Sequence, residues 1–149
     1  MGVDLFLRSF NEKKETVKTI KVERAAKVQK WLLEKAREGK SGSCWAENIL
    51  KENDLEQLIA AHISGRFLQY TREDKDFLYG LNFEIGFNYP DIAEKLVSGK
   101  MTPEEIPAEI IENYIKKRND FENREVQKVI NFLKESFEKN LKVEVYANW

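Results

Sequence analysis

Residues 141–149 read LKVEVYANW, and this C-terminal stretch determines which fold class the chain can adopt. Leu141, Val143 and Val145 alternate with charged residues, which is the period of a strand with one buried face. At the other end of the chain, Val3–Phe10 is apolar and rich in β-forming residues, which predicts a second strand. We expect the two terminal strands to lie close together in a small antiparallel sheet.

A third strand is predicted in the middle of the chain, at Leu81–Tyr89. Every second residue of this segment is leucine, isoleucine or aromatic, whereas a helix would place Phe83 and Phe87 on other faces than Leu81. Helical patterns fill most of the remainder, at residues 23–38, 44–51, 54–64, 90–98, 108–117 and 121–139. We therefore predict an α+β fold that is predominantly helical, with a small antiparallel sheet formed by N-terminal, central and C-terminal strands.

Several boundaries of these elements have recognisable local signals. Residues 102–105, Thr-Pro-Glu-Glu, combine an N-cap threonine, a proline suited to the first helical position and a glutamate at N3. Gly65 and Gly99 predict the ends of helices. Residues 16–23 suit either a strand or the approach to a helix. Residues 116–120, KKRND, either separate the last two helical patterns or form a hydrated turn of one long helix.

The composition points to one folded domain, at residues 1–149. The chain has 149 residues, 42% of them hydrophobic, and carries a net charge of −1. A net charge so close to zero argues against binding nucleic acid through the overall field of the protein. The sequence has no apolar run of membrane-spanning length and no signal peptide at its N-terminus, so we expect a soluble, cytoplasmic protein.

The charges are distributed unevenly along the chain. In residues 1–43, Lys and Arg outnumber Asp and Glu by 11 to 6, whereas in residues 44–115 the acidic residues outnumber the basic ones by 14 to 6. Such an asymmetry is typical of a protein with a partner-binding face, although the two regions can also simply face water.

The single cysteine, Cys44, lies in a segment with a tempting motif. Gly42, Ser43, Cys44 and Trp45 resemble the residues around the nucleophile of papain-like cysteine proteases, which implies a reactive thiolate at a helix N-terminus. A hydrolase that uses Cys44 with His62 as its base is therefore one alternative. That family has its histidine about 130–150 residues downstream, whereas His62 follows much sooner. We favour a packed, structural Cys44, with Trp45 as a core anchor.

The polar side of the predicted central strand suggests a different kind of site. Asn82, Glu84 and Asn88 would project together, with Tyr89 beside them and Gly86 leaving room for close approach. If a helix covers that side, these residues form a polar pocket for a small molecule or nucleotide. The sequence predicts no cofactor and no metal-ligand set.

A basic cluster completes the candidate residues. Lys116, Lys117 and Arg118 lie between apolar stripes and are predicted to bind a partner. Because the sequence lacks a complete catalytic set, we expect a small, non-enzymatic interaction protein of the inhibitor or adaptor type, a kind that phages and mobile elements also encode. Its expected partner is a protein, with a second copy of the chain included, rather than nucleic acid or a membrane.

Overall fold

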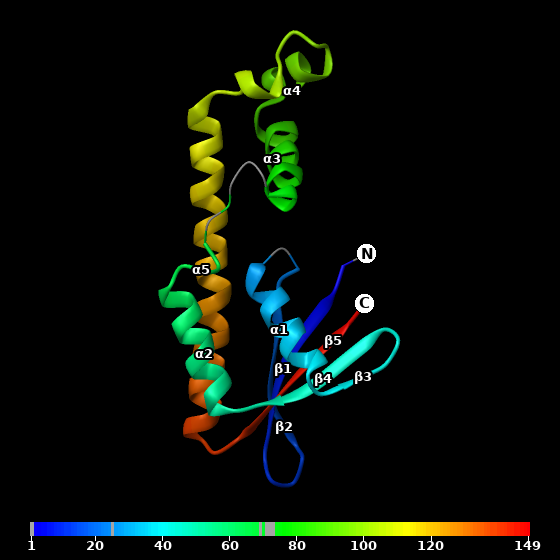
Figure 1. Cartoon of the computed structure of the whole chain (residues 1–149), viewed down its shortest axis with the longest axis vertical. Coiled ribbons are helices and arrows are strands. Elements are labelled where there is room, and N and C mark those ends of the chain that lie inside the picture. Colours follow the sequence, from blue (N-terminus) through cyan, green and yellow to red (C-terminus); the bar gives the residue numbers. More distant parts are fainter. Residues whose placement is uncertain (1, 25, 69, 71–73) are drawn as a thin grey trace. The chain divides into compact units, whose positions relative to one another are not determined.

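The computed structural model confirms the α+β class (Figure 1). It describes the chain apart from Met1, Ala25, Gln69 and residues 71–73, and apart from the side chain of Asp76. In chain order the elements are β1 (Asp4–Phe10), β2 (Thr16–Val22), α1 (Lys27–Arg37), β3 (Lys40–Ser41), β4 (Trp45–Leu50), α2 (Glu52–Ile63), α3 (Lys75–Asn88), α4 (Pro90–Val97), the 3-10 turn η1 (Pro103–Glu105), α5 (Ala108–Glu138) and β5 (Lys142–Asn148).

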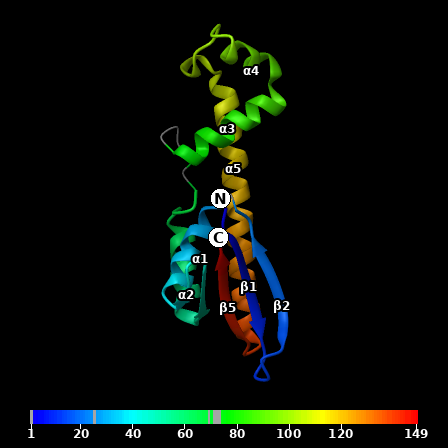
Figure 2. The same cartoon turned by 90° about the vertical axis from the view of Figure 1, so that its right-hand side faces the viewer.

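The strands form one antiparallel sheet in the order β2-β1-β5-β4-β3. As the sequence predicts, the two terminal strands pair along their whole length, from Asp4 opposite Asn148 to Phe10 opposite Lys142. Figure 2 shows β1 between β2 and β5. Of the two readings of residues 16–23, the strand is therefore correct.

The strands that the middle of the chain adds to the sheet are β3 and β4, not the predicted segment Leu81–Tyr89. The chain pairs β4 with the other edge of β5, so the helix expected over residues 44–51 is wrong. The alternation of β4 is hidden in the sequence because Asn48 shares the covered side of the strand with Ala46 and Leu50. Its side-chain amide donates a hydrogen bond of 2.8 Å to the carbonyl of Lys35, at the end of α1. A polar residue therefore occupies a position where the period of a strand calls for an apolar one.

Cys44 lies in the loop of the β3–β4 hairpin. Its side chain is exposed, so the expectation of a packed cysteine is wrong. The Gly/Ser-rich segment turns the chain between two strands rather than between two helices, and the Cys44 carbonyl accepts a hydrogen bond of 2.9 Å from the N–H of Trp149. Trp45 is half-buried and lies opposite Asn148 on the side of the sheet that the helices leave open, so it is not the expected core anchor.

The strand predicted at Leu81–Tyr89 is wrong, because α3 covers nearly all of it. Leu81 and Ile85 are buried on one side of this helix, whereas Phe83 and Phe87 are exposed on another. Each pair has the four-residue spacing of a helix, and the two pairs are offset by two residues. Interleaved in this way, two helical rows have the alternating pattern of a strand.

The chain divides into two compact units. Met1–Leu68 and Phe121–Trp149 form the first, which we call the sheet unit, and Gln69–Asp120 forms the second, the helical unit. Helix α5 runs without a break through residues 116–120, so it contributes its first part to the helical unit and the rest to the sheet unit. The single domain expected for residues 1–149 stays a prediction, since compactness does not test whether the units fold independently.

The covered side of the sheet carries the core of the sheet unit. Helices α1, α2 and α5 supply the apolar side chains that pack against it, and the largest fully buried leucines of this core are Leu5, Leu7, Leu32, Leu50, Leu58 and Leu133. The helical unit has a separate core of aromatic and branched side chains from α3, α5 and their connections, namely Tyr70, Phe77, Leu81, Ile85, Ile106, Ile110, Ile111 and Tyr114.

A buried carboxylate caps helix α1 from outside that helix. The N-cap residue, Ala26, has no side-chain oxygen, and the carboxylate of the fully buried Glu122 of α5 accepts the N–H of Lys27, with both oxygens at 2.7 Å. Beside it, the Glu125 carboxylate accepts the N–H of Glu23 at 3.2 Å. Negative charge at this end of α1 also complements the helix dipole.

Local signals placed most other helix ends correctly. Helix α4 begins at Pro90, and both Gly65 and Gly99 follow helices with positive φ values of 76° and 78°. Thr102 forms the expected capping box, since its N–H donates to the Glu105 carboxylate at 3.2 Å. The turn that it caps is the short η1, and α5 starts after it.

The cap on α1 can be tested by removing it. We expect Glu122→Ala to lower the free energy of unfolding by about 2–3 kcal/mol, because it leaves the N–H of the half-buried Lys27 without this acceptor and removes a helix cap. Glu122→Gln keeps one acceptor oxygen and should lower the free energy of unfolding by a smaller amount. Urea unfolding followed by circular dichroism measures both effects. Glu138→Ala, at an exposed position of the same helix, is the control, and an equal loss there would contradict the capping role.

Two glycines of α3 should respond to alanine in opposite ways. A methyl group at Gly80 would overlap the hydroxyl of Tyr114, whose buried ring lies 5.2 Å from that of Phe77, whereas one at Gly86 would meet open space. Gly80→Ala should therefore destabilise the protein by about 1–3 kcal/mol. Gly86→Ala should stabilise it by about 0.5–1 kcal/mol through helix propensity. Thermal unfolding of the two variants compares them directly, and shifts of the same sign would refute this packing of α3 on α5.

Candidate protein-binding surfaces

Helix α3 exposes three large aromatic side chains in one row. Tyr79, Phe83 and Phe87, which we call the aromatic row, are 69%, 52% and 79% exposed. They follow one another at four-residue intervals and so lie along one side of the helix. The buried residues Phe77 and Leu81 precede Tyr79 and Phe83 by two positions, which places them on nearly the opposite side.

The three rings touch one another along the row. The ring centroids of Tyr79 and Phe83 lie 4.9 Å apart in an edge-to-face arrangement, and those of Phe83 and Phe87 lie 6.3 Å apart with nearly parallel planes. These separations are in the range of favourable aromatic pairs. The row is therefore a continuous apolar ridge.

The stretch of α3 that carries the aromatic row is poor in charge, and Lys75 lies one turn before Tyr79 on the same side of the helix. Between Phe77 and Asn88 the only charged residue is Glu84, and its carboxylate accepts hydrogen bonds from the Lys117 ammonium of α5 at 3.0 and 3.2 Å. Close by, burial raises the pKa of the Tyr114 hydroxyl above its ordinary value, so this phenol remains neutral at physiological pH. The row thus has the composition of the centre of a protein interface, which is rich in aromatic and poor in charged residues.

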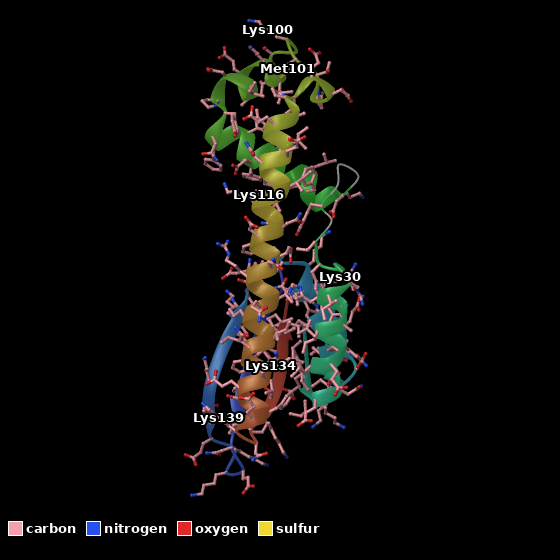
Figure 3. The ribbon with its side chains drawn as sticks, turned by 90° about the vertical axis from the view of Figure 1, so that its left-hand side faces the viewer. Lys30, Lys100, Met101, Lys116, Lys134 and Lys139 are labelled. Carbon is pink, nitrogen blue, oxygen red and sulfur yellow. The ribbon has the colours of Figure 1, made fainter. Side chains whose placement is uncertain are left out.

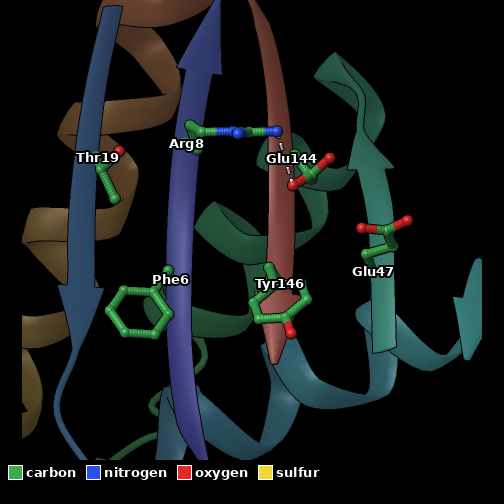
Figure 4. A pocket seen from close by; sticks show the side chains of 6 residues that line it. All are labelled: Phe6, Arg8, Thr19, Glu47, Glu144 and Tyr146. Atoms are coloured by element: carbon green, nitrogen blue, oxygen red, sulfur yellow. Dashed lines mark hydrogen bonds and ion pairs between the residues drawn. The ribbon is translucent and has the colours of Figure 1, made fainter. Parts of the chain in front are cut away.

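The second candidate surface is the side of the sheet that faces away from the helices, which we call the open face (Figure 4). Its side chains come from β2, β1, β5 and β4. A shallow depression of about 350 Å³ lies among them, and it is lined by Phe6, Arg8, Thr19, Glu47, Glu144 and Tyr146.

Two ion-paired groups organise the charges of the open face. The Arg8 guanidinium reaches from β1 across to the Glu144 carboxylate of β5, at 3.2 Å (Figure 4). Asp4 is paired with Arg24 at 2.9 Å and with Lys21 at 3.5 Å. The hydrogen bond from the Arg24 guanidinium lowers the pKa of the Asp4 carboxyl, which therefore stays ionised well into the acidic range.

Glu47 is the exception among the acidic residues of the depression. It is half-buried on β4, directly opposite Tyr146 of β5, and within the described part of the chain its carboxylate has neither a hydrogen bond nor an ion pair. Tyr146 in turn lies opposite Phe6 of β1. The depression therefore places an unpaired carboxylate next to the ring of Tyr146, with the ring of Phe6 one strand further on.

The structure does not bring Cys44 and His62 together as a nucleophile and its base. Cys44 lies in the β3–β4 loop, whereas His62 is half-buried near the end of α2, and no hydrogen bond joins them. The Nδ1 atom of His62 is buried and has no hydrogen-bond partner among the described residues, so nothing there orients the ring as a base. The segment around Cys44 also lacks the helix N-terminus that the protease resemblance implies.

The predicted ligand-binding residues do not share a face on α3. Glu84 and Asn88 lie one helical turn apart, whereas Asn82 projects in another direction and is exposed. Tyr89 follows the helix and packs against the core of the helical unit. Ligand binding by these residues stays a prediction, but the strand on which the pocket was expected does not exist.

The basic cluster on α5 is divided among different roles. Lys117 binds Glu84, and Arg118 donates a hydrogen bond of 3.3 Å to the Tyr70 hydroxyl and lies 5.2 Å above that ring. Lys116 is exposed (Figure 3). Partner binding by the cluster stays a prediction, with two of its three cations engaged in contacts within the helical unit.

Metal-ligand clusters and membrane-spanning helices are both absent from the described residues. Among them, no group of three or more His, Cys, Asp or Glu side chains is arranged to hold a metal ion. Over the same residues, none of the helices combines the length and the apolar character needed to cross a membrane.

Comparisons of the chain with protein-family models, with curated proteins and with solved structures find no match in any of the three.

Neither candidate surface was predicted from the sequence. The aromatic row was hidden by its interleaving with the buried row of α3. For the open face a signal was present, since Phe6, Arg8, Glu144 and Tyr146 alternate with buried residues in the two terminal strands.

Proposed function

We propose that the protein acts by binding a protein partner, as an inhibitor or adaptor does, and that the aromatic row of α3 is its principal contact. The observation that carries the proposal is that α3 is apolar on two opposite sides and buries only one of them. A helix that is apolar all round normally lies in a protein interior. The exposed row is therefore a surface that a partner is expected to cover.

The energetic argument rests on the size of the rings. Burying a large apolar side chain completely stabilises a complex by about 1.5–3 kcal/mol, and Tyr79, Phe83 and Phe87 are all more than half exposed. Aromatic residues also dominate the contacts that contribute most to measured binding energies. Leu78, which is 44% exposed, adds further apolar surface on α3.

The geometry of the row suggests how the partner is bound. Side chains repeated every four residues along one helix are the anchors that enter a hydrophobic groove in helix-in-groove recognition. Glu84 and Lys117 are paired with each other, so α3 has no unpaired charge between Tyr79 and Phe87. We infer that the partner offers an apolar groove or a helix of matching spacing.

An intracellular setting is part of this proposal. The exposed thiol of Cys44 would remain free in the reducing environment of the cytoplasm, where structural disulfides are rare. The alternative functions are less well supported. Cys44 and His62 are not joined by a hydrogen bond, and Asn82 and Asn88 do not share a face of α3.

The proposal is tested by placing a charge in the centre of the row. Phe83→Asp should reduce the recovery of a specific bound protein from native lysate by roughly thirtyfold, because the central ring of such a row is a hot spot. Val97→Asp, which changes an even more exposed apolar residue of the same unit, is the matched control and should retain the partner. Circular dichroism verifies that both variants are folded.

Two outcomes would contradict the proposal. If Phe83→Asp and wild type retain the same proteins in the same amounts, the row is not the contact surface. If the wild type is a dimer by analytical ultracentrifugation and Phe83→Asp makes it a monomer, the row is covered by a second copy of the chain rather than by a different protein.

A further inference from the structure

We propose that the depression on the open face binds a basic side chain, arginine or lysine, of a polypeptide. This inference concerns the sheet unit and does not rest on the proposal for α3. Three observations support it, namely the balance of charge among the lining residues, the two aromatic rings that follow the unpaired carboxylate across the sheet, and the shallow shape of the depression.

The charges that line the depression leave one carboxylate to be neutralised. Arg8 and Glu144 form an ion pair at 3.2 Å, and Glu47 has no partner among the described side chains. A half-buried carboxylate has lost part of its hydration without gaining a counter-ion, so it favours a cation that approaches along the sheet. Lys40 lies opposite Glu47 on β3 and is exposed, but forms no ion pair with it.

The aromatic rings supply the second attraction. In the register of the sheet, Phe6, Tyr146 and Glu47 occupy consecutive positions across β1, β5 and β4. The face of an aromatic ring attracts a guanidinium or ammonium group within about 6 Å of the ring centroid. The open face already has such contacts, since the Lys21 ammonium lies 5.9 Å from the Phe6 centroid and the Arg8 guanidinium lies 5.7 Å from that of Phe10.

The shape of the depression indicates that the cation belongs to a larger molecule. Sites for free small molecules enclose most of the ligand, whereas this depression is shallow and open to solvent. A cation held there gains affinity from further contacts along the sheet, and a polypeptide can provide them. Arginine is among the residues that most often anchor protein interfaces.

A single-stranded nucleic acid is the competing occupant, because its bases stack on exposed aromatic rings of a sheet. The carboxylates of Asp4, Glu47 and Glu144 lie on this same face and would repel its phosphates. Basic residues of the face, such as Arg8 and Lys21, are already paired with two of them. The charge of the depression therefore favours a cation.

The test uses the ¹⁵N-labelled full chain and two matched probes. Nα-acetyl-arginine N-methylamide should cause saturable shifts of backbone amides in β1, β5 and β4, and the corresponding lysine probe should act on the same amides. Nα-acetyl-citrulline N-methylamide, which has nearly the same shape without the charge, should not. Glu47→Gln should lower the affinity for the arginine probe by about fivefold. Lys40→Ala, which removes a competing cation, should raise that affinity.

The control variants separate this site from general electrostatics and from α3. Glu34→Gln makes the same change of charge at an exposed position of α1 and should leave the affinity unchanged, as should Phe83→Asp. Tyr146→Leu should lower the affinity for the arginine probe because it removes an aromatic ring from the depression. Equal shifts with citrulline, or an unchanged affinity after Glu47→Gln, would overturn the proposal. Stronger shifts of these amides by oligothymidylate than by the arginine probe would also overturn it, in favour of nucleic acid.

Discussion

The buried carboxylate of Glu122 is the interaction on which the arrangement of the sheet unit depends. It holds the N-terminus of α1 against α5, so that both helices cover the same side of the sheet. A carboxylate is costly to bury unless hydrogen bonds satisfy it, and the free N–H groups of a helix start supply such bonds together with a favourable dipole. With its helices fixed on one side, the sheet keeps its other side open.

The helical unit meets a different constraint, because α3 has more apolar surface than the unit can cover. Its buried row packs against α5, where Gly80 allows close approach to Tyr114, and its ion pair between Glu84 and Lys117 lies at the edge of that contact. The remaining apolar side of the helix stays in water. An exposed apolar surface of this kind lowers the solubility of a protein, and such surfaces commonly mark binding sites.

The sequence predicted the fold class and the terminal strands because these depend on simple periodicity. The apolar residues of β1 and β5 alternate, and the proline and glycines around α4 act locally, as they do in any chain. The errors at residues 44–51 and 81–89 have different causes. Asn48 faces inward because Lys35 offers a carbonyl, and α3 reads as a strand because two helical rows interleave. Neither the burial of Glu122 nor the depression beside Glu47 has a local signal, since each depends on residues distant in sequence.

The division into two units has an optical consequence. All three tryptophans, Trp31, Trp45 and Trp149, belong to the sheet unit, whereas four of the five tyrosines belong to the helical unit. Tryptophan emission therefore reports on the sheet unit alone, and circular dichroism at 222 nm reports on the helices of both. Denaturation curves from the two signals coincide if the shared helix α5 makes the units unfold together, and separate if each unit melts by itself.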